Sequence, residues 1–92
     1  MKKPEISFRV IDGSGPLSVY WHKGPYGDAL ECKEGTGVVW LSPGGELLGV
    51  EFDDVNEKSD KQILTLPDDT FVEVAVKKAK VSIQIHHPAA VH

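Results

Sequence analysis

The feature that most constrains the fold is a pair of apolar runs separated by a turn, "GVVWLSPGGELLGVEF", residues 37–52. Side chains alternate between the two faces of a strand, so Val38 and Trp40 share one face and Val39 and Leu41 share the other. The "SPGG" between the runs suits a tight turn, because proline presets φ and glycine accepts positive φ. The segment therefore predicts a β-hairpin.

The return run of this hairpin contains a glycine between apolar residues. Leu48, Val50 and Phe52 share one face, whereas Gly49 contributes no side chain to the other. A glycine inside a strand commonly marks a bulge or a close approach of another backbone. We expect one of these two features at Gly49.

Other segments show the same alternation and predict further strands. They are "EISFRVI" at 5–11, "LSVYWH" at 17–22, "ALECKE" at 29–34 and "VSIQI" at 81–85. The first two are separated by "DGSGP" at 12–16, which has the residues of a turn. Short connections rich in glycine and proline favour pairing of strands in sequence order. The polar residues 53–61 predict a surface loop.

Two periods compete in "TFVEVAVKKAK", residues 70–80. Thr70 and Glu73 have the spacing of a helix capping box, and the lysines that follow suit a helix C-terminus. The β-branched and aromatic residues at 71–76 favour a strand instead. We expect a short helix from Thr70 to Lys80.

These segments predict a mainly β fold with an α+β character. We expect one domain over residues 1–92, built as a small antiparallel β-meander of four to six strands with one short C-terminal helix. Residues 86–92, "HHPAAVH", are expected to form a frayed tail. A meander of this size has exposed edges, and exposed edges invite pairing with another strand.

Composition excludes several classes of protein. The net charge of −4 argues against binding of duplex nucleic acid, which requires a basic face. No run approaches the roughly 18 apolar residues that span a bilayer. The start, "MKKPEISFRV", lacks the apolar core of a signal peptide, so we expect a cytoplasmic protein without membrane contact. Cys32 is the single cysteine, which excludes an internal disulfide.

The order of "FRVID", "SVYW", "ALECKE" and "GVVWLSPGGELLGVEF" resembles the domain-of-unknown-function 2283 family of small bacterial and archaeal proteins. The match covers about half of the chain and is strongest at "GELLGVEF". The chain differs from the family in having "GPLS" before the tyrosine strand and Pro43 in the turn. The resemblance implies a small β-meander and an antitoxin-like or other binding role. It implies no catalytic residues.

The acids that end the hairpin are the first candidate for chemistry. Glu51, Asp53 and Asp54 could supply oxygen ligands to calcium or magnesium, or form a small metal-dependent hydrolase together with His22. Their spacing does not fit a calcium-binding loop, because Lys58 occupies a ligand position and no glycine follows. A solvated strand end is the favoured interpretation, so we expect no metal or other cofactor.

Cys32 and His22 could form a thiolate–imidazole pair, although a lone cysteine more often packs as a small apolar group. Adjacent histidines in a strand point to opposite faces, so His86 and His87 are not expected to share a metal ion. Terminal His92 and the lysines at 77, 78 and 80 are interpreted as solvated groups.

The aromatic residues are the remaining candidates. Trp21 and Trp40 share their faces with aliphatic residues, which favours core packing. Tyr20, His22 and Tyr26 lie beside loops and are the expected contact residues, since tyrosine is enriched at interfaces. We therefore expect a non-enzymatic interaction module, either antitoxin- or inhibitor-like or self-associating. Its partner would be another protein or a second copy bound at a sheet edge.

Overall fold

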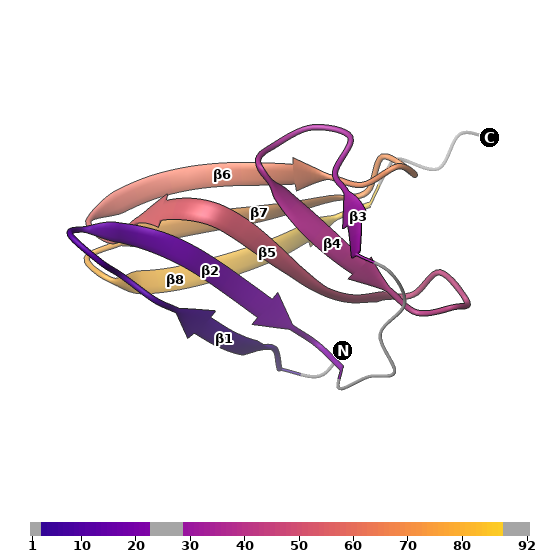
Figure 1. The fold of residues 1–92 in the computed structure, drawn as a ribbon, viewed down its shortest axis with the longest axis horizontal. Coiled ribbons are helices and arrows are strands. Elements are labelled where there is room, and N and C mark those ends of the chain that lie inside the picture. The colour runs from indigo at the N-terminus through magenta and orange to yellow at the C-terminus, as the bar shows by residue number, and fades with distance from the viewer. Residues whose placement is uncertain (1–2, 23–28, 88–92) are drawn as a thin grey trace.

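The computed structural model describes residues 3–22 and 29–87 and contains two antiparallel sheets (Figure 1). The first sheet has five strands in the order β1-β2-β5-β4-β3, and the second has three in the order β6-β7-β8. The strands are β1 (Glu5–Phe8), β2 (Ser14–Tyr20), β3 (Ala29–Glu31), β4 (Gly37–Leu41), β5 (Leu47–Asn56), β6 (Ser59–Thr65), β7 (Phe71–Lys77) and β8 (Lys80–His86). No described residue is helical, so no helix in the described part could cross a membrane.

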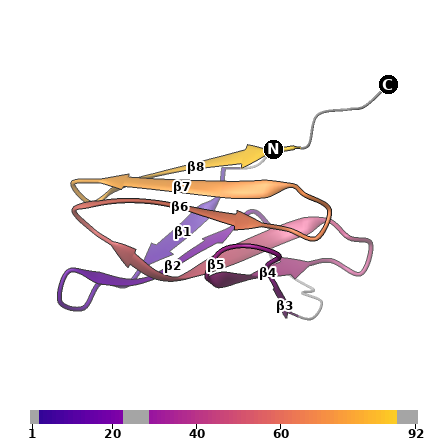
Figure 2. The ribbon, with the colours of Figure 1, turned by 90° about the horizontal axis from the view of Figure 1, so that it is seen from above.

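The two sheets form two layers, with the three-stranded sheet lying across one face of the five-stranded sheet (Figure 2). The hydrophobic core fills the space between them. Its buried members are Leu17, Val19, Trp21, Val39, Val50, Phe52, Val55, Leu64, Leu66, Val72, Val74 and Val76. One face of each sheet is therefore buried and the other is open to solvent, as is usual in antiparallel folds.

The register explains which residues enter this core. Leu17 lies opposite Phe52, and Val19 lies opposite Val50, so two rows of apolar side chains meet on the inner face. All four side chains are completely buried. The alternation read from residues 17–22 and 37–52 is confirmed for this face, and so is the burial of Trp21.

The predicted hairpin at residues 37–52 is confirmed as β4, β5 and a tight turn. In the turn, Ser42 N donates to Glu46 O at 2.8 Å, and Gly45 N donates to Ser42 O at 2.9 Å. Gly45 has a φ of 89°, a conformation that glycine adopts at little cost. The register shifts between Trp40 and Leu41, opposite Gly49, so the expected irregularity is present there.

The strand order differs from a simple meander. β2 pairs with β5, whereas the following β3 lies at the far edge beside β4. β5 is ten residues long and is the third of the five strands in the order of the sheet, so it forms the centre of the sheet. The described chain contains eight strands rather than four to six, because residues assigned to a loop and a helix also form strands.

The expected helix at Thr70–Lys80 is wrong, because residues 71–77 form β7. Val72, Val74 and Val76 lie on one face of this strand and are buried, at 0%, 0% and 3% exposure. A strand places all three in the core between the sheets, whereas a helix would turn some of them to solvent. Glu73 does not cap a helix but contacts Lys61 Nζ on the adjacent strand at 3.3 Å.

The expected loop at residues 53–61 is also wrong, because β5 continues to Asn56 and β6 begins at Ser59. The corner between them is fixed by backbone hydrogen bonds to both neighbouring turns. Glu57 N donates to Gly13 O, Lys78 N to Lys58 O and Ala79 N to Glu57 O. At the C-terminus, His86 belongs to β8 rather than to a tail, and residues 88–92 lie outside the described residues.

Candidate functional site

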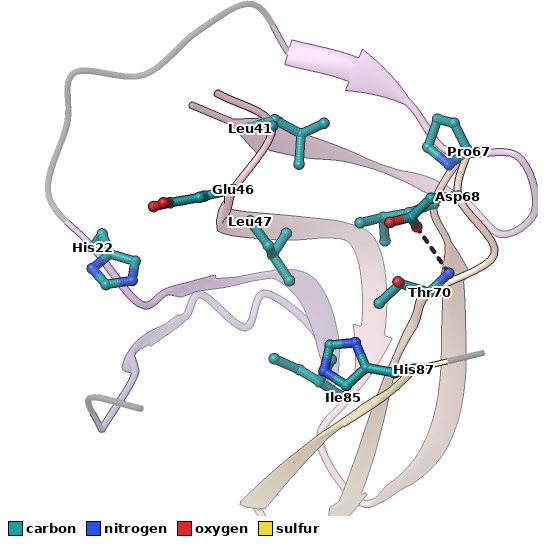
Figure 3. A pocket seen from close by; sticks show the side chains of 11 residues that line it. His22, Leu41, Glu46, Leu47, Pro67, Asp68, Thr70, Ile85 and His87 are labelled. Carbon is teal, nitrogen blue, oxygen red and sulfur yellow. Dashed lines mark hydrogen bonds between the residues drawn. The ribbon is translucent and has the colours of Figure 1, made fainter. Parts of the chain in front are cut away.

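A cleft of about 530 Å³ opens between the two sheets at one end of the molecule (Figure 3). The ends of β2 and β8, the β4–β5 turn and the β6–β7 connection surround it. Its described lining residues are His22, Leu41, Gly45, Glu46, Leu47, Leu66, Pro67, Asp68, Thr70, Ile85 and His87. The floor is apolar, because the leucines and Ile85 extend the core to this end.

The polar lining residues of the cleft are His22, Glu46, Asp68, Thr70 and His87. Thr70 N donates a hydrogen bond of 2.9 Å to Asp68 Oδ1. This bond is the main cause that lowers the pKa of the Asp68 carboxyl below its usual value. Asp68 thus fixes the β6–β7 connection. Among the described residues, no three histidine, cysteine or acidic side chains are grouped to hold a metal ion.

The acidic residues proposed as a hydrolase site do not converge. Glu51 accepts a hydrogen bond of 3.2 Å from Ser18 Oγ on the outer face of the five-stranded sheet. Asp53 and Asp54 lie at a bulge in β5, where Pro16 of β2 interrupts the regular register. His22 lies at the cleft, which none of these acids lines. The arrangement provides no common pocket for the four side chains.

Cys32 follows β3 and packs against the edge of the core. Burial, followed by the nearby charge of Asp53, raises the pKa of the Cys32 thiol. A raised pKa keeps the sulfur protonated at neutral pH, whereas a nucleophilic cysteine requires the thiolate. The environment of Cys32 is therefore that of a packed thiol.

The expected contact residues Tyr20, His22 and Tyr26 are not brought together as one described surface. Tyr20 lies on the outer face of the five-stranded sheet, His22 lines the cleft, and Tyr26 lies outside the described residues. The Tyr20 ring instead pairs with Trp40, with centroids 5.8 Å apart and planes at 40°. Trp40 is half-buried on this outer face, so the expectation that it joins the core is wrong.

His86, the last residue of β8, and the following His87 lie on opposite sides of the three-stranded sheet, as predicted. His86 stacks on Phe71 on the outer face of the three-stranded sheet, with ring centroids 4.5 Å apart and planes at 13°. Its Nε2 lies 3.4 Å from Glu73 Oε1. His87 lines the cleft between the sheets. The pair therefore cannot chelate one ion.

The edge strands of the two sheets differ in how well they are protected from pairing with another strand. The two sheets leave four edge strands, β1, β3, β6 and β8. β1 has four residues and follows Pro4, and β3 has three residues followed by charged Lys33 and Glu34. Short edge strands, charges and proline are the devices that prevent pairing with other chains.

The C-terminal part of the β6 edge is covered by the chain itself. Lys33 N donates to Thr65 O at 2.7 Å, and Thr65 N donates to Glu34 O at 2.9 Å. Gly35 also lies against this edge, since a Cβ on it would stand 2.2 Å from Ile63 O. The β3–β4 connection thus closes this side of the two layers.

β8 is the least protected of the four edges within the described residues. It is seven residues long, contains no proline, and carries one permanent charge, Lys80, at its start. The β7–β8 turn has two residues with positive φ, Lys78 at 51° and Ala79 at 65°, so Lys77 and Lys80 form its hydrogen-bonded closing pair. The ladder alternates from there, which turns the N–H and C=O groups of Val81, Ile83 and Ile85 away from β7.

Sequence reasoning identified the strand at 81–85 but not its position at an edge. The available signal was the absence of proline and internal charge from "VSIQI". Comparison with family models, curated proteins and solved structures gives no match to this chain. The resemblance to the domain-of-unknown-function 2283 family therefore stays a sequence-based prediction.

Proposed function

We propose that this chain is a non-enzymatic interaction module that binds an extended protein strand at the edge of β8. The observation that supports the proposal is the contrast between β8 and the other three edges, which are short, charged or covered. An edge strand binds an extended chain through main-chain hydrogen bonds, a recurrent mode of peptide recognition.

The side chains of β8 also suit an added strand. Val81, Ile83 and Ile85 point to the inner face and are only half-buried, although they pack against the core. A strand beside them would extend the inner face and remove more of their apolar surface from water. On the outer face, Ser82 and Gln84 are exposed and neutral, so they would not repel a partner.

The alternative function, a small metal-dependent hydrolase, receives less support. It required Glu51, Asp53, Asp54 and His22 in one concave site, but His22 lines the cleft without the acids. The tertiary structure thus separates the residues on which that hypothesis depended.

The edge proposal can be tested with a displayed library of seven-residue peptides held between flexible spacers. We expect the selected peptides to be rich in β-branched residues and to bind with alternate side chains facing the core. Chemical synthesis with ligation at Cys32 allows methylation of the Ile83 backbone nitrogen, which removes one outward donor without changing a side chain. This change should abolish peptide binding.

The matched control is methylation of the Ser7 or Ile6 nitrogen on β1, at whichever of the two points away from β2. This variant should bind the selected peptides as the unmodified chain does. Peptides that bind equally to the Ile83-methylated chain would place the binding surface elsewhere and overturn the proposal. Circular dichroism must show that each methylated chain is folded.

A further inference from the structure

We infer that the strand bound at the β8 edge is β8 of a second copy of this chain, antiparallel and centred on Ile83. This inference rests on the proposed function and names its partner. The resulting pairing would join two three-stranded sheets into one six-stranded sheet around a two-fold axis, the commonest symmetry of soluble oligomers.

The direction of the outward backbone groups limits the possible registers. Two copies of one edge pair about a two-fold axis when residues with outward N–H and C=O groups lie opposite one another. In β8 the outward residues are Val81, Ile83 and Ile85, and any residue of the strand could be the centre of such a pairing. Centring on Ile83 pairs all seven residues of β8, because Lys80–His86 is symmetric about it. Centring on any other residue of β8 leaves at least two of its residues unpaired.

The side chains that this register brings together are compatible. On the inner face, Ile83 lies opposite Ile83 of the second copy, and Val81 lies opposite Ile85. On the outer face, Ser82 lies opposite Gln84. Cross-strand pairs of β-branched residues stabilise antiparallel sheets, and none of these pairs opposes like charges.

The ends of the strand add charge complementarity. The register places Lys80 opposite His86 of the second copy. His86 Nε2 lies 3.4 Å from Glu73 Oε1, so each Lys80 ammonium would approach a carboxylate on the other chain. Glu73 also contacts Lys61 of its own chain at 3.3 Å, so its carboxylate would lie near two lysine ammonium groups in the dimer. The two-fold axis repeats this contact at the opposite end.

Charge variants on the exposed outer face test both the partner and the register. The double variant Ser82→Lys/Gln84→Lys places lysine opposite lysine at two positions of the dimer. The double variant Ser82→Glu/Gln84→Lys places glutamate opposite lysine at the same two positions. Both variants change the same two exposed residues, so the difference between them reports the cross-strand pairing.

Sedimentation equilibrium of the full chain over a range of concentrations supplies the measurement. We expect the wild-type chain to dimerise. The lysine–lysine variant should raise the dimer dissociation constant by about tenfold or more over that of the glutamate–lysine variant, from two cross-strand charge pairs. Amide hydrogen exchange at Val81, Ile83 and Ile85 should slow as the dimer forms.

Several outcomes would overturn the inference. A chain that stays monomeric at all concentrations excludes the second copy, and the peptide selection then decides whether the edge binds a different strand. Equal dissociation constants for the two charge variants exclude this register. A dimer that persists after methylation of the Ile83 nitrogen places the contact on another surface.

Discussion

The ring of Tyr20 lies directly over Gly49, so that a Cβ on Gly49 would stand 2.5 Å from Tyr20 Cδ1. The same Cβ would stand 2.9 Å from the backbone oxygen of Val19. The absence of a side chain at Gly49 lets the Tyr20 ring cross the central strand and reach Trp40, 5.8 Å away between centroids. The glycine thus makes room for an aromatic pair on the outer face.

Replacement of Gly49 by alanine should destabilise the protein. We expect the free energy of unfolding to fall by about 1–3 kcal/mol, the usual cost of inserting a methyl group into a filled space. Urea denaturation provides the measurement. Gly44→Ala is the matched control, because its nearest contact would be Ser42 Oγ at 3.7 Å and its φ is not positive.

The role of the Tyr20 ring can be separated from that of the Val19 carbonyl by a double-mutant cycle. If the ring causes the clash, Gly49→Ala should cost less in a Tyr20→Ala background than in the wild type. An equal cost in both backgrounds would assign the clash to the backbone. A loss no larger than that of Gly44→Ala would contradict the close packing over Gly49.

The β7–β8 turn stores backbone strain that glycine should relieve. Lys78 and Ala79 both have positive φ, at 51° and 65°, a conformation that costs a non-glycine residue roughly 1–2 kcal/mol. Glycine loses more entropy on folding, which offsets part of the gain. We expect Ala79→Gly to raise the unfolding free energy by about 0.5–1 kcal/mol, measured by thermal or urea denaturation.

The control for the turn is Ala75→Gly in the middle of β7, where the same change should destabilise the strand by about 0.5–1 kcal/mol. Opposite signs at the two alanines are therefore expected. A loss of stability in Ala79→Gly would show that residue 79 does not adopt the left-handed conformation in solution.

The Asp60 carboxylate should make folding stability depend on acid pH. It accepts hydrogen bonds from Asn56 N at 2.9 Å, from Gln62 Nε2 at 3.0 Å and from Lys61 N at 2.8 Å. The bond from Asn56 is the largest cause that lowers the pKa of Asp60. The contribution of the Asp60 carboxylate to stability is therefore complete at pH values above the pKa of aspartate in the unfolded chain, about 3.9. It is lost as the pH falls through the lower pKa that Asp60 has in the folded protein.

Asp60→Asn should reduce the unfolding free energy by roughly 1 kcal/mol at pH 7, less than for a buried charged group because solvent screens it. The difference from wild type should shrink below about pH 4. Chemical denaturation at a series of pH values checks this. The control is Asp54→Asn, because no hydrogen bond to the Asp54 carboxylate is described, and it should lower the unfolding free energy by less. A difference between Asp60→Asn and wild type that does not change with pH would contradict the prediction.

The Cys32 thiol should react slowly with a disulfide reagent at pH 7. Burial and the Asp53 charge raise its pKa, which lowers the thiolate fraction. Asp53→Asn removes the second cause, so the reaction should accelerate by a few-fold. Absorbance of the released thiolate measures the rate. Rapid reaction of the native wild-type chain would show that Cys32 is not packed, and the urea-unfolded chain gives the reference rate.

Local sequence was sufficient where alternation and turn residues agreed. The apolar rows of 37–52 and the "SPGG" turn specify β4, β5 and the tight turn between them, because strand period and turn chemistry are local properties. Residues 81–85 were predicted as a strand for the same reason. The irregularity opposite Gly49 is also predictable from the sequence, because a glycine inside a strand commonly marks a bulge or a close approach of another backbone.

The local sequence pattern predicted the wrong element where helix and strand had similar propensity. Thr70, Glu73 and the lysines after Val76 fit a helix, but Val72, Val74 and Val76 fit a strand. The pairing of β7 with β6 and β8 decides between them, because it buries all three valines in the core. That burial depends on partners distant in the sequence, which propensity does not represent.

The candidate site depended even more on tertiary structure. Alternation placed Val38 with Trp40 and Val39 with Leu41, but it did not say which face would be buried. The three-stranded sheet covers one face, so Val39 is fully buried and Trp40 pairs with Tyr20 on the other. The sequence by itself thus determined the strands and turns where alternation and turn residues agreed, and which side chains share a face. Only the packing of the two sheets decided which face forms the core. It also decided that the β3–β4 connection lies against the end of β6, whereas no described segment pairs with the outer edge of β8.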